Sequence, residues 1–220
     1  MVSMKNFVRF VLFSTLINSL CTPMAAKADS MLVDPAAAGS AAAAHLDFAI
    51  TITQTLFLRV SAGAANNASS STVDTLTFEV PAANAGNGNA VGGTGGDLAA
   101  GSATVRVYGN GGSISLNSAT TGPLTSAAGD TLSWNQISVL ASPLPSGSAG
   151  FANAGVPHPA FNTGPAGGNG AAITLESASK VVRVEGRWTY GYLNANPVPA
   201  GTYGATAARN GRVTYTATQL

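Results

Sequence analysis

Apolar residues recur at every second position through most of the chain after residue 46, the period of β-strands with one buried and one wet face. The clearest case is 180–192, where five apolar side chains share one face: Val182, Val184, Trp188, Tyr190 and Tyr192. Three charged side chains alternate with them: Arg183, Glu185 and Arg187. The segment therefore predicts a strand whose charged face forms a ladder in contact with water.

Similar patterns predict further strands over 46–60, 72–80, 103–108, 113–117, 131–140, 172–176 and 212–218. A shift of phase near Gln54 indicates a bulge or bend in the first of them. No segment after residue 46 keeps a helical period of 3.6 residues. About eight short strands separated by Gly, Asn, Ser and Pro predict an all-β protein, built as a single antiparallel β-sandwich.

The first 28 residues have the three parts of a secretory signal. Lys5 and Arg9 give a positive start, and 10–20 is an apolar run, shorter than the roughly 20 residues that a membrane span needs. Ala26-Lys27-Ala28 supplies a small-x-small cleavage site. We therefore expect removal of 1–28, no membrane span in the mature chain, and a secreted or cell-surface location.

A lipoprotein attached through Cys21 is the alternative. It is disfavoured because Leu20 stands where the lipoprotein peptidase needs a small residue. The Ala-rich stretch 29–45 is expected to be a flexible leader, and the β-sandwich domain is expected to cover 46–220.

Charge and composition exclude several classes of function. Only 9% of the 220 residues are charged, and without Lys5, Arg9 and Lys27 seven basic residues stand against nine acidic ones. No run of positive charge could neutralise a row of phosphates, so no nucleic-acid partner is expected. Cys21 is the single cysteine and only His45 and His158 supply imidazole, so neither a metal site nor a cofactor site is predicted.

The candidate catalytic and calcium motifs are incomplete. Residues 92–100 (GGTGGDLAA) resemble one calcium-binding nonapeptide, but such sites need stacked repeats and the chain has one copy. Residues 111–115 (GGSIS) begin like a nucleophile elbow but lack its last glycine. His158 stands between two prolines that fix its backbone, which could present its ring to a ligand; we favour the simpler interpretation of a stiff loop. The acidic residues are scattered rather than paired as in glycosidases, so we expect a non-enzymatic protein.

Four aromatic residues are candidate ligand contacts, because an exposed stripe of rings can stack on a sugar: Trp134, Trp188, Tyr190 and Tyr192. Val182 and Val184 share the face of three of them, which favours a place in the core instead. A carbohydrate-binding module with a glycan partner is therefore the second functional hypothesis. The Gly-rich loops 82–102 and 142–170 are either surface decoration, which we favour, or recognition edges of the sandwich if they are ordered. The second loop has room for compact β-structure around Phe151 and Phe161.

The closing segments 199–203 (PAGTY) and 211–217 (GRVTYTA) resemble the final hairpin of bacterial fimbrial, pilin-like and secreted coat-type β-sandwich proteins. Leu46-Asp47-Phe48 is similar to the opening strand of such domains. The resemblance implies an immunoglobulin-like or Greek-key sandwich. It also implies a structural or adhesive role at the cell surface, by self-association or with other surface subunits. The chain departs from ordinary pilins in having no cysteine pair.

Strand addition is the mechanism that this resemblance implies, in which an extended segment of one subunit supplies an edge strand to its neighbour. Phe48, Ile50 and Ile52 alternate behind the expected flexible leader and form the candidate donor strand. The simpler alternative, which we favour from the sequence, is that this strand completes its own domain.

Overall fold

The computed structural model describes residues 29–63 and 68–220, so the predicted secretory signal lies outside the described residues. Within these ranges the protein is mostly β and has no α-helix, which confirms the all-β prediction. The strands form four sheets, one mixed and three antiparallel. The chain divides into two units, Met1–Thr51 and Ile52–Leu220. No helix in the described part of the chain is long and apolar enough to cross a membrane.

The described residues of the first unit, 29–51, contain no strand. A turn is closed by a hydrogen bond of 3.0 Å from the Ser40 amide to the Ala37 carbonyl. The exposed His45 Nδ1 lies 2.7 Å from an Asp29 carboxylate oxygen. The strand predicted over 46–60 is therefore wrong in its first half, and pairing begins only at β1 (Leu56–Val60).

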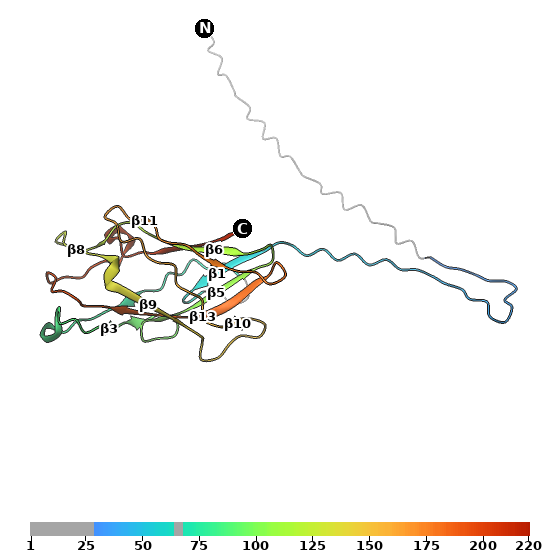
Figure 1. The fold of residues 1–220 in the computed structure, drawn as a ribbon, viewed down its shortest axis with the longest axis horizontal. Coiled ribbons are helices and arrows are strands. Elements are labelled where there is room, and N and C mark those ends of the chain that lie inside the picture. The colour runs from blue at the N-terminus through green and yellow to red at the C-terminus, as the bar shows by residue number, and fades with distance from the viewer. Residues whose placement is uncertain (1–28, 64–67) are drawn as a thin grey trace, which may run out of the picture. The chain divides into compact units, whose positions relative to one another are not determined.

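The larger sheet is organised around the long strand β13. Its six strands are β1 (Leu56–Val60), β3 (Val91–Gly92), β5 (Ser102–Gly109), β9 (Ile137–Ser142), β10 (Ala152–Asn153) and β13 (Val182–Tyr192). β13 pairs with β5 along one side and with β9 along the other, and β1 forms the edge beyond β5 (Figure 1). β10 pairs with β13 in parallel, so the expectation of purely antiparallel pairing is wrong at this position.

The second sheet is organised around β6 and is antiparallel. Its strands are β6 (Ile114–Thr120), β11 (Gly168–Asn169), β12 (Ile173–Leu175) and β14 (Thr214–Gln219). β14 pairs with β6 on one side, and β11 and β12 pair with it on the other. Two short pairs, β2 (Leu76–Thr77) with β4 (Thr94–Gly95) and β7 (Leu124–Thr125) with β8 (Thr131–Leu132), complete the sheets. Three 3-10 turns lie at Ala82–Asn84, Trp134–Gln136 and Ala207–Arg209.

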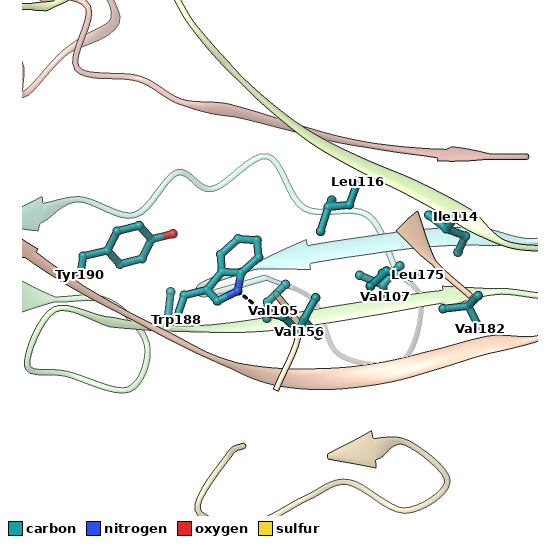
Figure 2. Packing of buried hydrophobic residues seen from close by; sticks show 10 residues of the cluster. Val105, Val107, Ile114, Leu116, Val156, Leu175, Val182, Trp188 and Tyr190 are labelled. Atoms are coloured by element: carbon teal, nitrogen blue, oxygen red, sulfur yellow. Dashed lines mark hydrogen bonds between the residues drawn. The ribbon is translucent and has the colours of Figure 1, made fainter. Parts of the chain in front are cut away.

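One hydrophobic core joins the two larger sheets. Figure 2 shows Ile114 and Leu116 of β6 on the opposite side of this core from Val105 of β5 and Trp188 of β13. All four side chains are fully buried. Because successive residues of a strand point to opposite faces, the period-2 pattern places these side chains together.

The Pro- and Gly-rich segment 142–170 is part of the core, and its prediction as surface decoration is wrong for its second half. Val156 is only 1% exposed, and its carbonyl accepts a hydrogen bond of 2.6 Å from Trp188 Nε1 (Figure 2). Gly186 of β13 lets this segment approach, because a Cβ there would lie 2.7 Å from the Val156 amide nitrogen. The segment was missed because its burial follows no period.

The charged ladder of β13 does not face water throughout, which corrects the sequence prediction. Glu185 is fully buried, and its carboxylate accepts hydrogen bonds of 3.0 and 2.7 Å from Arg106 of β5. Ser148, from the loop before β10, also donates to Glu185 through its backbone amide. Burial alone would raise the pKa of Glu185, but the hydrogen bonds from Ser148 and Arg106 and the charge of Arg106 lower it.

The other long loop, 82–102, is likewise ordered rather than decorative. It contributes β3 to the larger sheet and β4 to a short pair. Its first half is organised by the buried Asn194, whose side chain accepts from the Gly86 amide at 2.8 Å and donates to the Asn84 carbonyl at 2.8 Å. A single amide side chain can thus order a glycine-rich loop that has no apolar pattern of its own.

Candidate functional site: an apolar arm and an aromatic groove

Residues 46–52, which we call the apolar arm, expose large apolar side chains at every second position. Leu46 is 71% exposed, and the candidate donor residues Phe48, Ile50 and Ile52 are 84%, 86% and 80% exposed. None of them belongs to a strand in the part of the chain that the structure describes. Scattered apolar residues are normal on a surface, but four in alternating order form a continuous patch of the kind that marks an interaction site.

The residues that follow the arm are fixed to the body of the second unit. Asn110 holds them from both sides: its side-chain oxygen accepts from the Thr55 amide at 2.7 Å, and its side-chain nitrogen donates to the Thr53 carbonyl at 3.0 Å. Asn110 directly follows Gly109, which pairs with Leu56 at the start of β1. The arm is therefore anchored at the Leu56 end of β1.

An aromatic groove of about 440 Å³ lies in the second unit, and its volume falls in the range of small-ligand pockets. Its rings come from both larger sheets and from the segments between them: Phe78, Trp134, Phe161, Tyr190, Tyr203 and Tyr215. Val60, the last residue of β1, and Val213, just before β14, also line it. The groove thus opens beside two edge strands, because β1 pairs only with β5 and β14 pairs only with β6 among the described strands.

A short chain of polar groups lies behind the rings of the groove. His158 Nε2 lies 2.8 Å from the hydroxyl of Tyr215, and that hydroxyl lies 3.1 Å from the hydroxyl of Tyr190. The His158 ring also packs edge-on against Trp188 and Phe161, with ring centres 4.6 and 4.7 Å away. His158 therefore belongs to a loop, as the sequence suggested, but its half-buried ring packs against the core.

Burial keeps this polar chain uncharged at neutral pH. It lowers the pKa of His158 to about 4 and raises the pKa of Tyr190 to about 12, against a smaller opposing effect of the Tyr215 hydrogen bond. It also raises the pKa of Tyr215 well above its ordinary value. A groove with neutral, mutually bonded groups behind it favours an apolar occupant over an ion.

The charged residues at the rim differ from this interior. Asp74 lines the groove, but its carboxylate accepts hydrogen bonds from the Ser61 hydroxyl and from the Ala62 amide. These two bonds lower the pKa of Asp74. Because its hydrogen bonds fix the turn after β1, Asp74 acts as a structural group. Arg212 also lines the groove and is exposed.

The four predicted ligand aromatics do not form an exposed stripe. Trp188 is fully buried, and Trp134, Tyr190 and Tyr192 are only 7%, 7% and 6% exposed. Trp134 and Tyr190 line the groove, whereas Trp188 and Tyr192 do not. Trp134 Nε1 is occupied by a hydrogen bond of 2.8 Å to the Gly122 carbonyl.

Sequence reasoning missed three residues of this site. Tyr215 carried a signal, because it lies on the apolar side of the strand predicted over 212–218, but nothing marked it as part of a site. Phe161 and His158 carried only weak signals, an aromatic residue in a Gly-rich loop and a histidine between two prolines, because their segment shows no alternation. The proximity of His158 to Trp188 and Tyr190, and of Phe161 to Trp134, arises only from the fold.

The structure gives the calcium-like motif another role. Asp97 pairs with Arg59 of β1 at 2.8 Å and accepts from the Thr104 amide of β5 at 2.7 Å. This carboxylate therefore joins the loop 92–100 to the larger sheet. No cluster of three or more His, Cys, Asp or Glu residues that could hold a metal occurs in residues 29–63 and 68–220.

Comparison with known proteins found no matching family model, no matching curated protein and no matching solved structure.

Proposed function

We propose that the chain is a secreted, non-enzymatic protein of the cell surface, of fimbrial or coat type, that acts by self-association through its apolar arm. The observation that carries the proposal is the exposure of Leu46, Phe48, Ile50 and Ile52 at alternate positions, with no partner strand in residues 29–63 and 68–220. A segment of this kind is stabilised by adding to another chain, where main-chain hydrogen bonds supply affinity and side-chain pockets supply register.

The size of the hydrophobic contribution supports association. Full burial of one large apolar side chain contributes about 1.5–3 kcal/mol, so the four side chains of the arm contribute roughly 6–12 kcal/mol. Bringing two molecules together costs about 4–15 kcal/mol. The gain and the cost are of similar size, so main-chain hydrogen bonds and repeated contacts along a polymer decide the strength of the complex.

The proposed fold is an immunoglobulin-like or Greek-key sandwich that serves as a rigid body for this arm. Two observations support it: the two larger sheets share one core, and each ends in an edge strand, β1 or β14, on the side of the groove. The proposed location rests on the sequence of residues 1–28, which has the order of a secretory signal.

Sedimentation velocity of the exported full chain tests self-association. The test variant carries Phe48→Ser, Ile50→Ser and Ile52→Ser, which remove the apolar patch. The control carries Ala49→Ser, Thr51→Ser and Thr53→Ser at the interleaved positions. We expect the wild type and the control to form oligomers at micromolar concentration, and the arm variant to sediment as a monomer. Oligomers of equal strength in all three proteins would exclude the arm as the interface.

Carbohydrate binding is a second candidate function, favoured by one observation. Trp134 and Tyr190, two of the sequence-predicted ligand aromatics, line the same groove. The test is a glycan screen read by tryptophan fluorescence, with Tyr190→Phe as the variant that removes only a hydroxyl. A saturable signal from a monomeric protein would favour this function over self-association.

A further inference from the structure

The chain contains four Asn–Gly sequences, and this dipeptide is the one most prone to spontaneous deamidation because glycine has no side chain to hinder the reaction. They are Asn87-Gly88, Asn110-Gly111, Asn169-Gly170 and Asn210-Gly211, and all of them lie in the described part of the chain. We propose that the fold protects these four modification sites, so that the folded chain resists a chemical change that its sequence favours. This inference does not depend on the proposed function.

Deamidation begins at the backbone nitrogen of the glycine. That nitrogen gives up its proton and attacks the side-chain carbon Cγ of the asparagine. A bond forms between the two atoms, the bond from Cγ to Nδ2 breaks, and ammonia leaves with the proton. Water then opens either carbonyl of the resulting succinimide ring and gives aspartate or isoaspartate. The reaction therefore requires a glycine N–H that is free to lose its proton and a backbone that is free to rotate toward the side chain.

In each of the four sequences the glycine N–H already donates to an acceptor within the protein, which holds its proton and its orientation. An ordinary two-residue Asn–Gly hairpin differs, because there the residue after the glycine makes the bond across the turn and the glycine N–H faces water. Three of the glycines donate to backbone carbonyls: Gly88 to Asn194 at 2.9 Å, Gly170 to Ser118 at 2.8 Å and Gly211 to Thr206 at 2.8 Å.

Protection of Asn110 depends on one side chain. The side-chain oxygen of Gln219, in β14, accepts from the Gly111 amide at 2.6 Å and from the Gly112 amide at 2.8 Å, in the amide orientation that turns the oxygen toward both donors. Gln219 is therefore the residue that holds the Gly111 proton. Because a side chain can be replaced without changing the backbone, this site lets the role of the hydrogen bond be tested separately from the fold.

Deamidation at two of the sites would remove a contact that the fold uses. Asn110 Nδ2 donates to the Thr53 carbonyl at 3.0 Å, and Asn210 Nδ2 donates to the Pro123 carbonyl at 2.9 Å. The carboxylate of an aspartate has no hydrogen to donate, so its oxygen would face a carbonyl oxygen instead. Protection of the two asparagines thus preserves the attachment of the segment after the apolar arm and of the segment before β7.

Peptide mass spectrometry of the exported full chain tests the protection. The protein is incubated in mildly alkaline buffer, once folded and once in guanidinium chloride, and aspartate and isoaspartate are quantified at each of the four sites. Deamidation of the folded chain requires local opening, so its rate follows the population of the open form. We expect the rate at every site to be at least tenfold lower in the folded chain. Rates less than tenfold apart in the two states would overturn the inference.

Two substitutions at Gln219 test its role at Asn110. Gln219→Ala removes the acceptor of the Gly111 amide, whereas Gln219→Glu keeps an oxygen in its place. We expect Gln219→Ala to accelerate deamidation at Asn110 at least fivefold and to leave the other three sites unchanged. Gln219→Glu should keep Asn110 as slow as it is in the wild type. An equal acceleration at all four sites would indicate general loosening of the fold, and an unchanged rate at Asn110 would show that Gln219 does not protect it. Either result would overturn the role assigned to Gln219.

Discussion

At the scale of single residues, His158 shows how the fold overrides local sequence. Its two flanking prolines indicate a loop, yet its ring lies among Phe161, Trp188 and Tyr215 and bonds to the Tyr215 hydroxyl. The groups that face it are aromatic or hydroxyl groups, and no salt bridge to it occurs among the described residues. Its charge state is therefore controlled by burial.

This burial predicts a loss of stability in weak acid. The pKa of His158 is about 4 when folded and near its ordinary 6.5 when unfolded, so the unfolded chain binds the extra proton first. The stability that the buried, neutral His158 contributes is complete above pH 6.5. As the pH falls toward 4, the free energy of unfolding decreases by up to about 3 kcal/mol. Urea unfolding between pH 7 and 4.5 measures it, with His158→Gln as the comparison. An equally steep fall in the Gln variant would contradict the assignment.

A second residue-scale prediction concerns the turn at Ser179 and Lys180. Both have positive φ, 50° and 65°, and they close a two-residue hairpin between Ala178 and Val181. Glycine favours this geometry and lysine does not. Lys180→Gly should raise the free energy of unfolding by about 0.5–1 kcal/mol. Ala127→Gly, at an exposed loop residue without positive φ, should lower it. Destabilisation by both changes in urea titrations would contradict the turn geometry.

At the scale of elements, alternation predicted best the long strands that bury one face, whereas 72–80 pairs only at Leu76–Thr77 and 131–140 is interrupted by the 3-10 turn Trp134–Gln136. β5, β13 and β14 lie within a residue or two of the segments expected from alternation, because their apolar faces meet one core. The segment around Val156 escaped prediction, since its burial depends on a glycine of β13 that is distant in the sequence. The groove was not predicted for the same reason. Its rings belong to several segments, distant in the sequence, between Phe78 and Tyr215, and they share no local pattern.

The packing of residues 155–156 against β13 can be tested at Gly186. A Cβ at this position would lie 2.7 Å from the Val156 nitrogen and 2.8 Å from the Gly155 Cα, and both neighbours are backbone atoms that cannot rotate away. Gly186→Ala should therefore destabilise the protein by about 2 kcal/mol or more and change the fluorescence of Trp188, whose indole bonds to Val156.

Gly92→Ala is the matched control. It also lies in a strand of the larger sheet, but its Cβ would meet no atom within 4 Å. Its free energy of unfolding should change by no more than about 0.5 kcal/mol. A mild effect at Gly186, similar to that at Gly92, would mean that residues 155–156 do not pack against β13.

At the scale of the whole molecule, the protein combines a β-sheet body with an arm whose apolar side chains are exposed and belong to no strand among the described residues. Leu46, Phe48, Ile50 and Ile52 together expose more large apolar surface than any other continuous segment in the described residues. The sequence supplied the alternation of this arm but favoured its pairing within its own domain. The structure leaves it unpaired, because regular pairing starts only at Leu56.

The most direct test of this account is light scattering of the purified full chain over a wide range of concentration, compared with the variant that carries Phe48→Ser, Ile50→Ser and Ile52→Ser. The account predicts that the average mass of the wild type rises with concentration and that the variant keeps the mass of a monomer. A wild-type mass that stays at one monomer throughout, or an equal rise in both proteins, would contradict it.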